Sequence, residues 1–532
     1  MKHIPPLLLF LIPLTLLASD LPQEVPRPAI ESYRHVGVTP FVAKPEGING
    51  QYRKMTLSPQ TLPDPLLRYQ LNVFALEKET GNAYPLYVAA LARYNEILNQ
   101  TMQGVYRSEA YQALDPSESE YQRDVDRLRF KAFPVYQHWG RDAHTEITPE
   151  DEERLYRNLN EVFQFMERAS RRTYYDWSDR YEYRGIATLL PQVQEARELA
   201  RYLASKANWE IRHGRYNDAI RTIRVGLALS DHILEAQPPT YLVGMLVGIA
   251  IKGIMQEQLF LLAAQPDSPN LYPALMQIQV SSKSWLDALR SEMMCLLAPQ
   301  HSGADFLETI DRLSPEQAKA FLDEVMKTFL SVNGGDRWDD FESALSVWRT
   351  GFYVGAYLPA KQRLLQKGLS EREIEALSTH QIIAPFVYEE LRRAYDLLIV
   401  SASMPMGESR TAIGDAGEYV DQIRHRIASP VDIIISLLMP AVDAARTAHH
   451  RQEQTLDLLK IIEALRYYAS VHGQLPKSLA DITELAVPKM CPITGKPYEY
   501  RVEGRTAMID YDLDTRLDTH GSRSRIEITI DR

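Results

Sequence analysis

The fold of this chain is decided by residues 200–233, which read ARYLASKANWEIRHGRYNDAIRTIRVGLALSDHI. Leu203 and Ala207 stand four residues apart in the first half, a spacing that puts both side chains on one face of a helix. Gly214 interrupts this pattern, and apolar side chains then recur at steps of three and four residues in Tyr216, Ala219, Ile223 and Leu227. The spacing predicts a helical hairpin, in which a tight turn joins two helices.

The composition describes a globular chain of 532 residues that is 45% hydrophobic, so we expect sizeable cores and two or three domains. Its 70 acidic and 59 basic residues give a formal net charge of -11. Nucleic acids and anionic membrane surfaces are bound by basic faces, so this balance argues against either as the main partner.

The sequence contains two cysteines, Cys295 and Cys491. Two thiols are too few for a thiolate zinc cluster, and they allow at most one intramolecular disulfide. In an oxidising compartment that bond would join the helical part of the chain to its tail. The apolar neighbours Met293, Met294 and Leu296 favour a buried thiol at Cys295 instead.

The first nineteen residues have the pattern of a signal peptide. Lys2 and His3 give a polar start, residues 7–17 form a largely apolar run, and Ala18 and Ser19 supply small side chains for cleavage. The run is too short to span a bilayer, and no cysteine stands near the expected cut to carry a lipid. We therefore expect an exported protein, either periplasmic or secreted, with residues 1–19 removed.

Beyond residue 19 the character of the chain changes twice. Residues 20–65 are rich in proline without a sustained helical period, which indicates an extended or loosely packed lead-in. Residues 66–430 are expected to form a helical domain, and residues 431–532 a long helix followed by a small sheet. The strands of this sheet are predicted near 498–502, 506–511 and 526–530. The predicted fold class is mainly α, an irregular helical domain with one hairpin, plus a C-terminal α+β part.

Local signals place further helices in this domain. Apolar steps predict helices over 66–76 and 86–98, which a turn at Gly81 and Asn82 would join into a second hairpin. Thr148 and Pro149 mark a helix start, and capping boxes follow at 314–317 and 370–373.

Residues 241–264 form the most apolar internal stretch. Gly244 and Gly248 have the small-residue spacing of closely packed membrane helices. However, Lys252 and the polar residues 256–258 interrupt the stretch, which leaves fewer than the ~20 apolar residues that a span needs. We expect a buried helix that packs on the hairpin, and no integral membrane span after signal cleavage.

The C-terminal segment carries a resemblance in two groups of residues, Leu438, Met439, Pro440, Ala441, Val442, Ala444, Ala445 and Arg446, and then Leu459, Ala464, Leu465, Tyr467, Tyr468, His472, Gly473, Leu475 and Pro476. With Pro492, Thr494, Gly495, Lys496, Pro497 and Tyr500, these about one hundred residues resemble the region after the membrane anchor of pseudopilin-like proteins. The resemblance implies a long helix that leads into a small β-domain. Pseudopilins carry their apolar helix of about 20 residues at the very N-terminus. Here only 431–438 would correspond to that helix, so assembly into a fibre is not implied.

Two further resemblances cover other parts of the chain. Residues 200–233 resemble a single tetratricopeptide unit, and no second copy follows at a fixed period. Asp176-Trp177, residues 214–219 and residues 248–250 resemble segments of uncharacterised exported proteins of the planctomycete type. No catalytic or binding residue comes with this resemblance.

The aromatic run, residues 171–184, contains Tyr174, Tyr175, Trp177, Tyr181 and Tyr183 among arginines. Such side chains offer large faces and planar donors, so the run can be a stacking surface for sugar rings or a peptide. Aromatic residues bury more often than they bind, and we expect Trp177 and some of the tyrosines to belong to the core.

Three groups of polar residues resemble catalytic or metal-binding sites only weakly. Asp336, Asp339, Asp340 and Glu342 can supply the acid and base of a hydrolase, but acids also gather in the first turn of a helix. Asp510, Asp512, Asp514 and Asp518 imitate a calcium loop, but Thr515 stands at the glycine position, so a solvated β-turn is expected. His449 and His450 are adjacent, which suits a surface helix better than a metal.

The function expected from these observations is that of an exported helical binding or scaffolding protein of the cell envelope. Its partner would be a protein or an envelope polymer, contacted by the aromatic run or the hairpin groove. The sequence has no recognisable catalytic, metal-binding or cofactor-binding motif. Two alternatives stay open, a periplasmic hydrolase of envelope polymer that uses residues 336–342, and an envelope-assembly component that acts through the pseudopilin-like tail.

Overall fold

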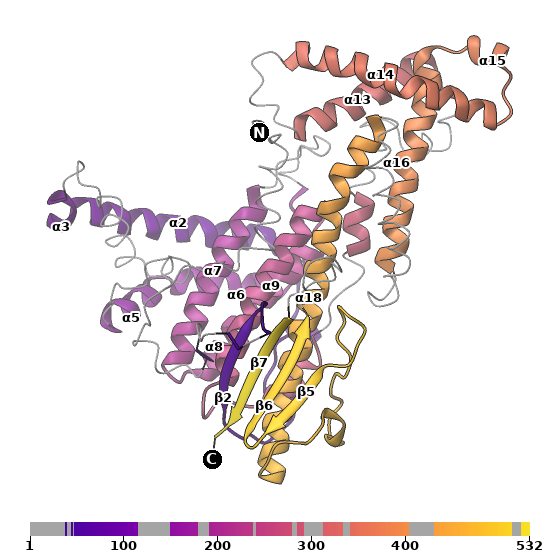
Figure 1. Cartoon of the computed structure of the whole chain (residues 1–532). Coiled ribbons are helices and arrows are strands. Elements are labelled where there is room, and N and C mark those ends of the chain that lie inside the picture. The colour runs from indigo at the N-terminus through magenta and orange to yellow at the C-terminus, as the bar shows by residue number, and fades with distance from the viewer. Residues whose placement is uncertain are drawn as a thin grey trace.

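Helices dominate the part of the chain that the computed structural model describes, which comprises residues 38–39, 44–45, 47–114, 149–178, 191–237, 241–278, 285–291, 312–332, 341–403, 430–512 and 523–531. A small mixed sheet lies at one end of the molecule (Figure 1). The predicted fold class, mainly helical with a C-terminal long helix and small sheet, is confirmed.

The predicted hairpin is formed by α7 (Pro191–Arg212) and α8 (Tyr216–Leu234). Gly214 stands in the turn between them with φ 68°, a left-handed conformation that glycine adopts without a steric penalty. The apolar stripe of α8 lies inside the protein, where Ala219, Ile223 and Leu227 are all buried. The hairpin therefore builds a core and leaves no open groove between its own helices.

Helix α9 (Tyr241–Ala263) packs against both helices of the hairpin, as predicted. By length and composition alone Leu242–Ala263 could cross a membrane, but 72% of its most apolar window is buried inside the protein. A Cβ at Gly248 would lie 2.8 Å from the Leu234 side chain, so this glycine allows α8 and α9 to approach closely.

The remaining helices of this region are α2 (Tyr84–Arg107), α3 (Glu109–Gln112), α5 (Pro149–Asn158), α6 (Asn160–Ser170) and α10 (Tyr272–Leu275). The helix predicted over 66–76 is wrong: this segment forms turns and a 3-10 turn, η2 (Ala75–Glu77), before strand β3 (Glu79–Asn82). Leu71 is buried there, but Leu66 and Leu76 are exposed. The apolar residues of the segment therefore do not share one buried face, which a helix this short needs for stability.

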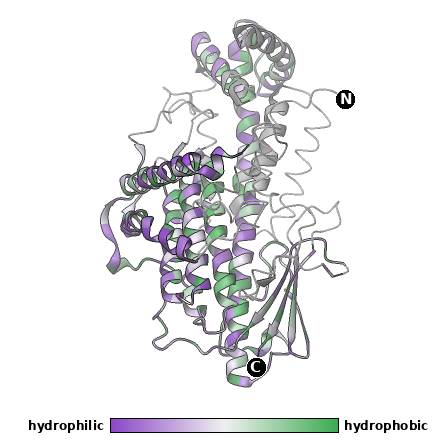
Figure 2. Ribbon diagram, turned by 90° about the vertical axis from the view of Figure 1, so that its left-hand side faces the viewer, coloured by the Kyte–Doolittle hydropathy of each residue, from purple (hydrophilic) through white to green (hydrophobic). Residues whose placement is uncertain are grey.

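Helix α18 (Pro430–His472) is the long helix predicted for the C-terminal part, and it continues through Pro440. It is followed by the 3-10 turn η7 (Leu479–Asp481) and the predicted strands β5 (Glu499–Glu503), β6 (Thr506–Asp512) and β7 (Arg523–Ile530). Figure 2 shows the sheet on one side of this helix and the helical bundle on the other.

The sheet also contains strands from the proline-rich lead-in. Strand β2 (Tyr52–Leu57) pairs in parallel with β7, and β1 (Val38–Thr39) pairs with β2, so the strand order is β1-β2-β7-β6-β5. Met55 and Leu57 of β2 are fully buried in the same core as Ile526, Ile528 and Ile530 of β7. Strands from the N-terminal part of the described chain therefore complete the sheet that the C-terminal strands form.

Two large cores account for most of the buried apolar side chains described. The larger one joins α2, α5 to α9, α18 and the sheet, so it crosses the boundary predicted at residue 430. The smaller one lies among α13 (Pro315–Val332), α14 (Phe341–Gln366), α15 (Glu371–Glu375) and α16 (Thr379–Ser403), at the top of Figure 1. Both predicted capping boxes form, at Ser314 with Gln317 and at Ser370 with Glu373.

Candidate functional site

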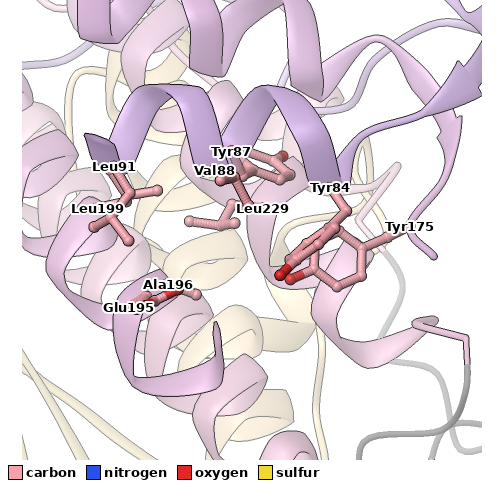
Figure 3. A pocket seen from close by; sticks show the side chains of 9 residues that line it. All are labelled: Tyr84, Tyr87, Val88, Leu91, Tyr175, Glu195, Ala196, Leu199 and Leu229. Atoms are coloured by element: carbon pink, nitrogen blue, oxygen red, sulfur yellow. The ribbon is translucent and has the colours of Figure 1, made fainter. Parts of the chain in front are cut away.

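The aromatic run meets α2 and the hairpin at a small surface hollow, which we call the aromatic hollow (Figure 3). It encloses about 270 Å³ including its open mouth. Its lining residues are Tyr84, Tyr87, Val88 and Leu91 from α2, Tyr175 after strand β4 (Arg172–Tyr174), Glu195, Ala196 and Leu199 from α7, and Leu229 from α8. Most of this volume is open solvent, so the hollow is a shallow depression of the surface and not an enclosed small-molecule site.

Asn82 fixes the tyrosines of the hollow relative to one another. Its side-chain Nδ2 donates to the carbonyl of Asp176 at 2.6 Å, and its Oδ1 accepts from the Asp176 amide at 2.8 Å. The same Oδ1 accepts from the amide of Tyr84, the first residue of α2, at 3.0 Å. One amide side chain therefore holds both the first turn of α2 and the segment that carries Tyr175.

The backbone on the other side of Tyr175 is also held. The Gln237 amide donates to the Tyr175 carbonyl at 2.9 Å, and the Trp177 amide donates to the Gln237 carbonyl at 3.0 Å. Together with the parallel pairing of β3 with β4, these bonds place residues 172–177 between the start of α2 and the end of α8. Tyr175 is thus presented to the hollow by a fixed backbone.

The aromatic rings form walls that meet at steep angles. The rings of Tyr84 and Tyr175 lie 5.6 Å apart, centroid to centroid, at 83°, and those of Tyr87 and Tyr175 lie 6.0 Å apart at 50°. Figure 3 shows Tyr84 and Tyr175 at one end of the hollow, with Leu91 and Leu199 at the other. Burial raises the pKa values of Tyr87 and Tyr175, so both phenols are neutral at physiological pH.

His232 supports the hollow from behind. Its Nε2 lies 3.0 Å from the Arg172 carbonyl oxygen, and its Nδ1 lies 2.9 Å from the Tyr87 hydroxyl. Burial lowers the pKa of His232, so the ring is neutral. A carbonyl only accepts, so Nε2 carries the proton and Nδ1 accepts from Tyr87. His232 therefore orients a wall of the hollow and is not placed for acid–base work.

Glu195 is the only charged residue among the nine that line the hollow. Its side chain is exposed at the rim, and within the described part of the chain no lysine, arginine or histidine forms an ion pair with it. The negative charge of Glu195 contributes to the raised pKa of Tyr175. The site thus combines aromatic walls, an aliphatic end and one carboxylate that faces solvent.

The structure divides the aromatic run as the core interpretation predicted. Trp177 and Tyr175 are buried, whereas the Tyr174 side chain is 48% exposed. Tyr181 and Tyr183 lie outside the described residues. Among the described residues of the run, the exposed Tyr174 and the edge of Tyr175 in the hollow are the parts that a stacking partner can reach.

The carboxylates proposed for a hydrolase are not described. Asp336, Asp339 and Asp340 lie outside the described residues, and Glu342 belongs to α14 but its side-chain surroundings are undescribed. The described part of α14 runs from Phe341 to Gln366, so the helix-start interpretation of these acids stays a prediction.

Asp510 corrects the expectation of a solvated β-turn. Asp510 and Asp512 lie on strand β6, while Asp514 and Asp518 lie outside the described residues. The Asp510 carboxylate is buried and accepts from Arg525 at 2.5 and 2.8 Å and from Arg523 at 3.0 Å. These guanidinium groups lower its pKa despite its burial. Asp510 is therefore the centre of an ion-pair network across the strands.

His449 also differs from expectation, because the surface-helix interpretation is wrong for it. Its side chain is 9% exposed where α18 faces α9, and burial lowers its pKa to about 4. The adjacent His450 is half-buried and its Nδ1 lies 2.8 Å from a Glu453 carboxylate oxygen. No group of three metal-ligating side chains of the His, Cys, Asp and Glu types is found among the described residues.

Cys491 is a buried free thiol whose sulfur accepts from the Gln454 side chain at 3.0 Å. Cys295 lies outside the described residues, so the disulfide proposed between them stays a prediction.

The sequence had singled out Tyr175 but missed Tyr84, Tyr87 and Glu195. Tyr84 carries a weak local signal, because it directly precedes Pro85 at a helix start. Nothing in the spacing links it to residues some ninety positions later. No family model matches the chain, and comparisons with curated proteins and with solved structures give no match.

Proposed function

We propose that this chain is an exported, mainly helical binding or scaffolding protein of the cell envelope, and that it contacts its partner through the aromatic hollow. The observation that carries the proposal is the chemistry of the lining, which has three tyrosines and one solvent-facing carboxylate but no serine, cysteine, histidine or lysine. Tyrosine is enriched at protein interfaces because it combines a large apolar ring with a polar tip. Such a lining favours contact over covalent chemistry.

The size of the hollow supports a macromolecular partner. Most of its volume of about 270 Å³ is open solvent, so it is a depression of the surface and does not enclose a small molecule. A surface of this kind contributes to binding when a partner covers it and excludes water from it. The partner would therefore be a polypeptide that covers the hollow with part of its own surface.

Assembly through the pseudopilin-like tail has less support. A fibre would need a free apolar face on α18, yet Leu458, Ile461 and Leu465 are each at most 3% exposed. They belong to the core that α18 shares with the helical bundle and the sheet. The hydrolase alternative has no observation in its favour among the described residues.

The proposal is tested by affinity capture of the full chain from its native envelope, comparing wild type with Tyr84→Ala. We expect a specific polypeptide to be retained by wild type and lost by this variant. Leu358→Ala on α14 is the control, because Leu358 is 65% exposed on a helix that packs in the other core. A partner that all three proteins retain equally, with unchanged circular dichroism, would place the contact elsewhere.

A further inference from the structure

We propose that residues 66–78, which we call the apolar strap, attach this protein to the surface of a lipid bilayer. The strap lies between strands β2 and β3, and none of its residues lines the aromatic hollow. The inference therefore goes beyond the proposed function and does not depend on it. Three features of the strap carry it: exposed apolar side chains, a backbone that is held in place, and a local excess of positive charge.

Exposed apolar side chains are concentrated in the strap. Of the twelve large hydrophobic side chains that are exposed in the described part of the chain, four belong to it, namely Leu66, Leu67, Phe74 and Leu76. A fifth, Met276, directly precedes Gln277, whose carbonyl accepts from the Asn72 side chain at 2.7 Å. Single exposed apolar residues are ordinary, but a cluster of them marks a contact surface.

The backbone of the strap is held against the protein. Leu71, in its middle, is 1% exposed and belongs to the larger core. The Glu77 amide donates to the Phe74 carbonyl at 2.9 Å, which closes the 3-10 turn η2 around Leu76. The Leu76 side chain is 101% exposed, so it stands entirely in solvent. The exposed side chains therefore project from a fixed segment, on both sides of its buried anchor.

The charges of the strap suit an anionic surface. Its one acid, Glu77, pairs with Arg224 of α8 at 3.0 Å. Its two bases, Arg68 and Lys78, form no ion pair with any residue in the described part of the chain. Asp64, just before the strap, offsets one of these charges. The strap is thus apolar and slightly basic, in a chain whose formal net charge is -11.

A bilayer fits this surface better than a protein partner or a second copy of the chain. Side chains that stand fully in solvent need matching pockets on a protein, whereas the fluid interface of a bilayer closes around protruding apolar groups. Anionic headgroups attract Arg68 and Lys78 while the leucines enter the boundary of the acyl chains. Two copies of the strap would instead bring these cations together.

The test is flotation of the full chain with large unilamellar vesicles, made either of phosphatidylcholine alone or of phosphatidylethanolamine with about one quarter phosphatidylglycerol. We expect wild type to bind both kinds and to prefer the anionic one. Leu67→Ser combined with Leu76→Ser should weaken partitioning into both about 10- to 100-fold, because two leucine side chains no longer leave water. Arg68→Gln combined with Lys78→Gln should weaken it about 5- to 30-fold on anionic vesicles only.

The control is Val354→Ser, because Val354 is 73% exposed on α14, a helix of the other core. It should partition like wild type. All of these substitutions are at exposed positions, and unchanged circular dichroism shows that the variants are folded. Absence of wild-type binding to both kinds of vesicle would overturn the inference, and so would equal partitioning of the double leucine variant and Val354→Ser.

A protein partner gives a different result. Retention of the chain by an envelope polypeptide that depends on Leu67 and Leu76, without any binding to vesicles, would also overturn the inference and make the strap a protein-docking surface. None of these results bears on the aromatic hollow, whose role is tested separately at Tyr84.

Discussion

Arg466 offers the sharpest test of how the larger core is held together. Its side chain is 0% exposed, and Nη1 lies 2.9 Å from a carboxylate oxygen of Glu463, which is 3% exposed. Nη2 donates to the carbonyl and hydroxyl oxygens of Ser268 at 2.8 and 3.0 Å. Nε donates to the Ser58 carbonyl at 3.1 Å. One guanidinium thus joins α18 to the segment after α9 and to the end of β2.

Replacing Arg466 by methionine should destabilise this core by about 3–5 kcal/mol, because it leaves the Glu463 carboxyl buried without its cation. The assay is hydrogen exchange of the amides in residues 456–469 under conditions where reclosing is faster than exchange, and their exchange rates should rise about 100- to 5,000-fold. The double variant Glu463→Met with Arg466→Met should recover more than about half of the lost free energy, because apolar residues of similar volume often replace a buried ion pair well.

The control for this prediction is Arg157→Met. Arg157 pairs with Glu153 at 3.4 Å on α5, but the two side chains are 74% and 60% exposed. Its loss should change stability by less than about 0.5 kcal/mol. An Arg466→Met variant whose exchange is as slow as that of Arg157→Met would refute the reasoning that Arg466 compensates a buried charge.

Three further predictions concern other links in the fold. Leu57→Ala should lower the free energy of urea unfolding by about 2–5 kcal/mol, because Leu57 is 0% exposed. Thr56→Val, on the exposed face of the same strand, should change it by less than about 0.5 kcal/mol. Equal effects of the two variants would mean that β2 does not complete the core. His449 titrates in the unfolded chain near its ordinary value of 6.5 and in the folded protein at about 4, so stability should fall as the pH drops from 6.5 towards 4. His449→Gln should reduce that fall by up to about 3 kcal/mol in urea titrations at pH 7 and pH 4.5, and an identical pH dependence of the two proteins would refute the assignment. Gly214→Ala should destabilise the protein by about 1 kcal/mol, because φ is 68° at this position, and should therefore lower its thermal midpoint. An unchanged midpoint in calorimetry would show that the turn relaxes to accept the side chain.

The sequence predicted the parts of the fold that depend on neighbours along the chain. The hairpin followed from apolar steps of three and four residues on either side of Gly214, and strands β5 to β7 followed from short β-leaning segments. The helix predicted over 66–76 failed because periodicity does not reveal whether a packing surface exists, and Leu66 and Leu76 face solvent.

Local sequence patterns do not reveal which distant segments pair with one another. Strand β2 joins β7 over a separation of more than 470 residues, and its own six residues carry no signal of that partner. The aromatic hollow is similar, because Tyr175 was noticed in a tyrosine-rich run while Tyr84 and Glu195 were not. They become neighbours only through the Asn82 bonds to Asp176 and the packing of α2 on the hairpin.

The claim that the aromatic hollow is the contact surface is tested most directly by site-specific photo-crosslinking. A benzophenone amino acid placed at Val88, a half-buried lining residue of the hollow, should form a discrete adduct with one polypeptide in the native envelope. The same group at Val354, which is 73% exposed on α14, should not capture that polypeptide. An adduct at Val354 together with none at Val88 would contradict the account.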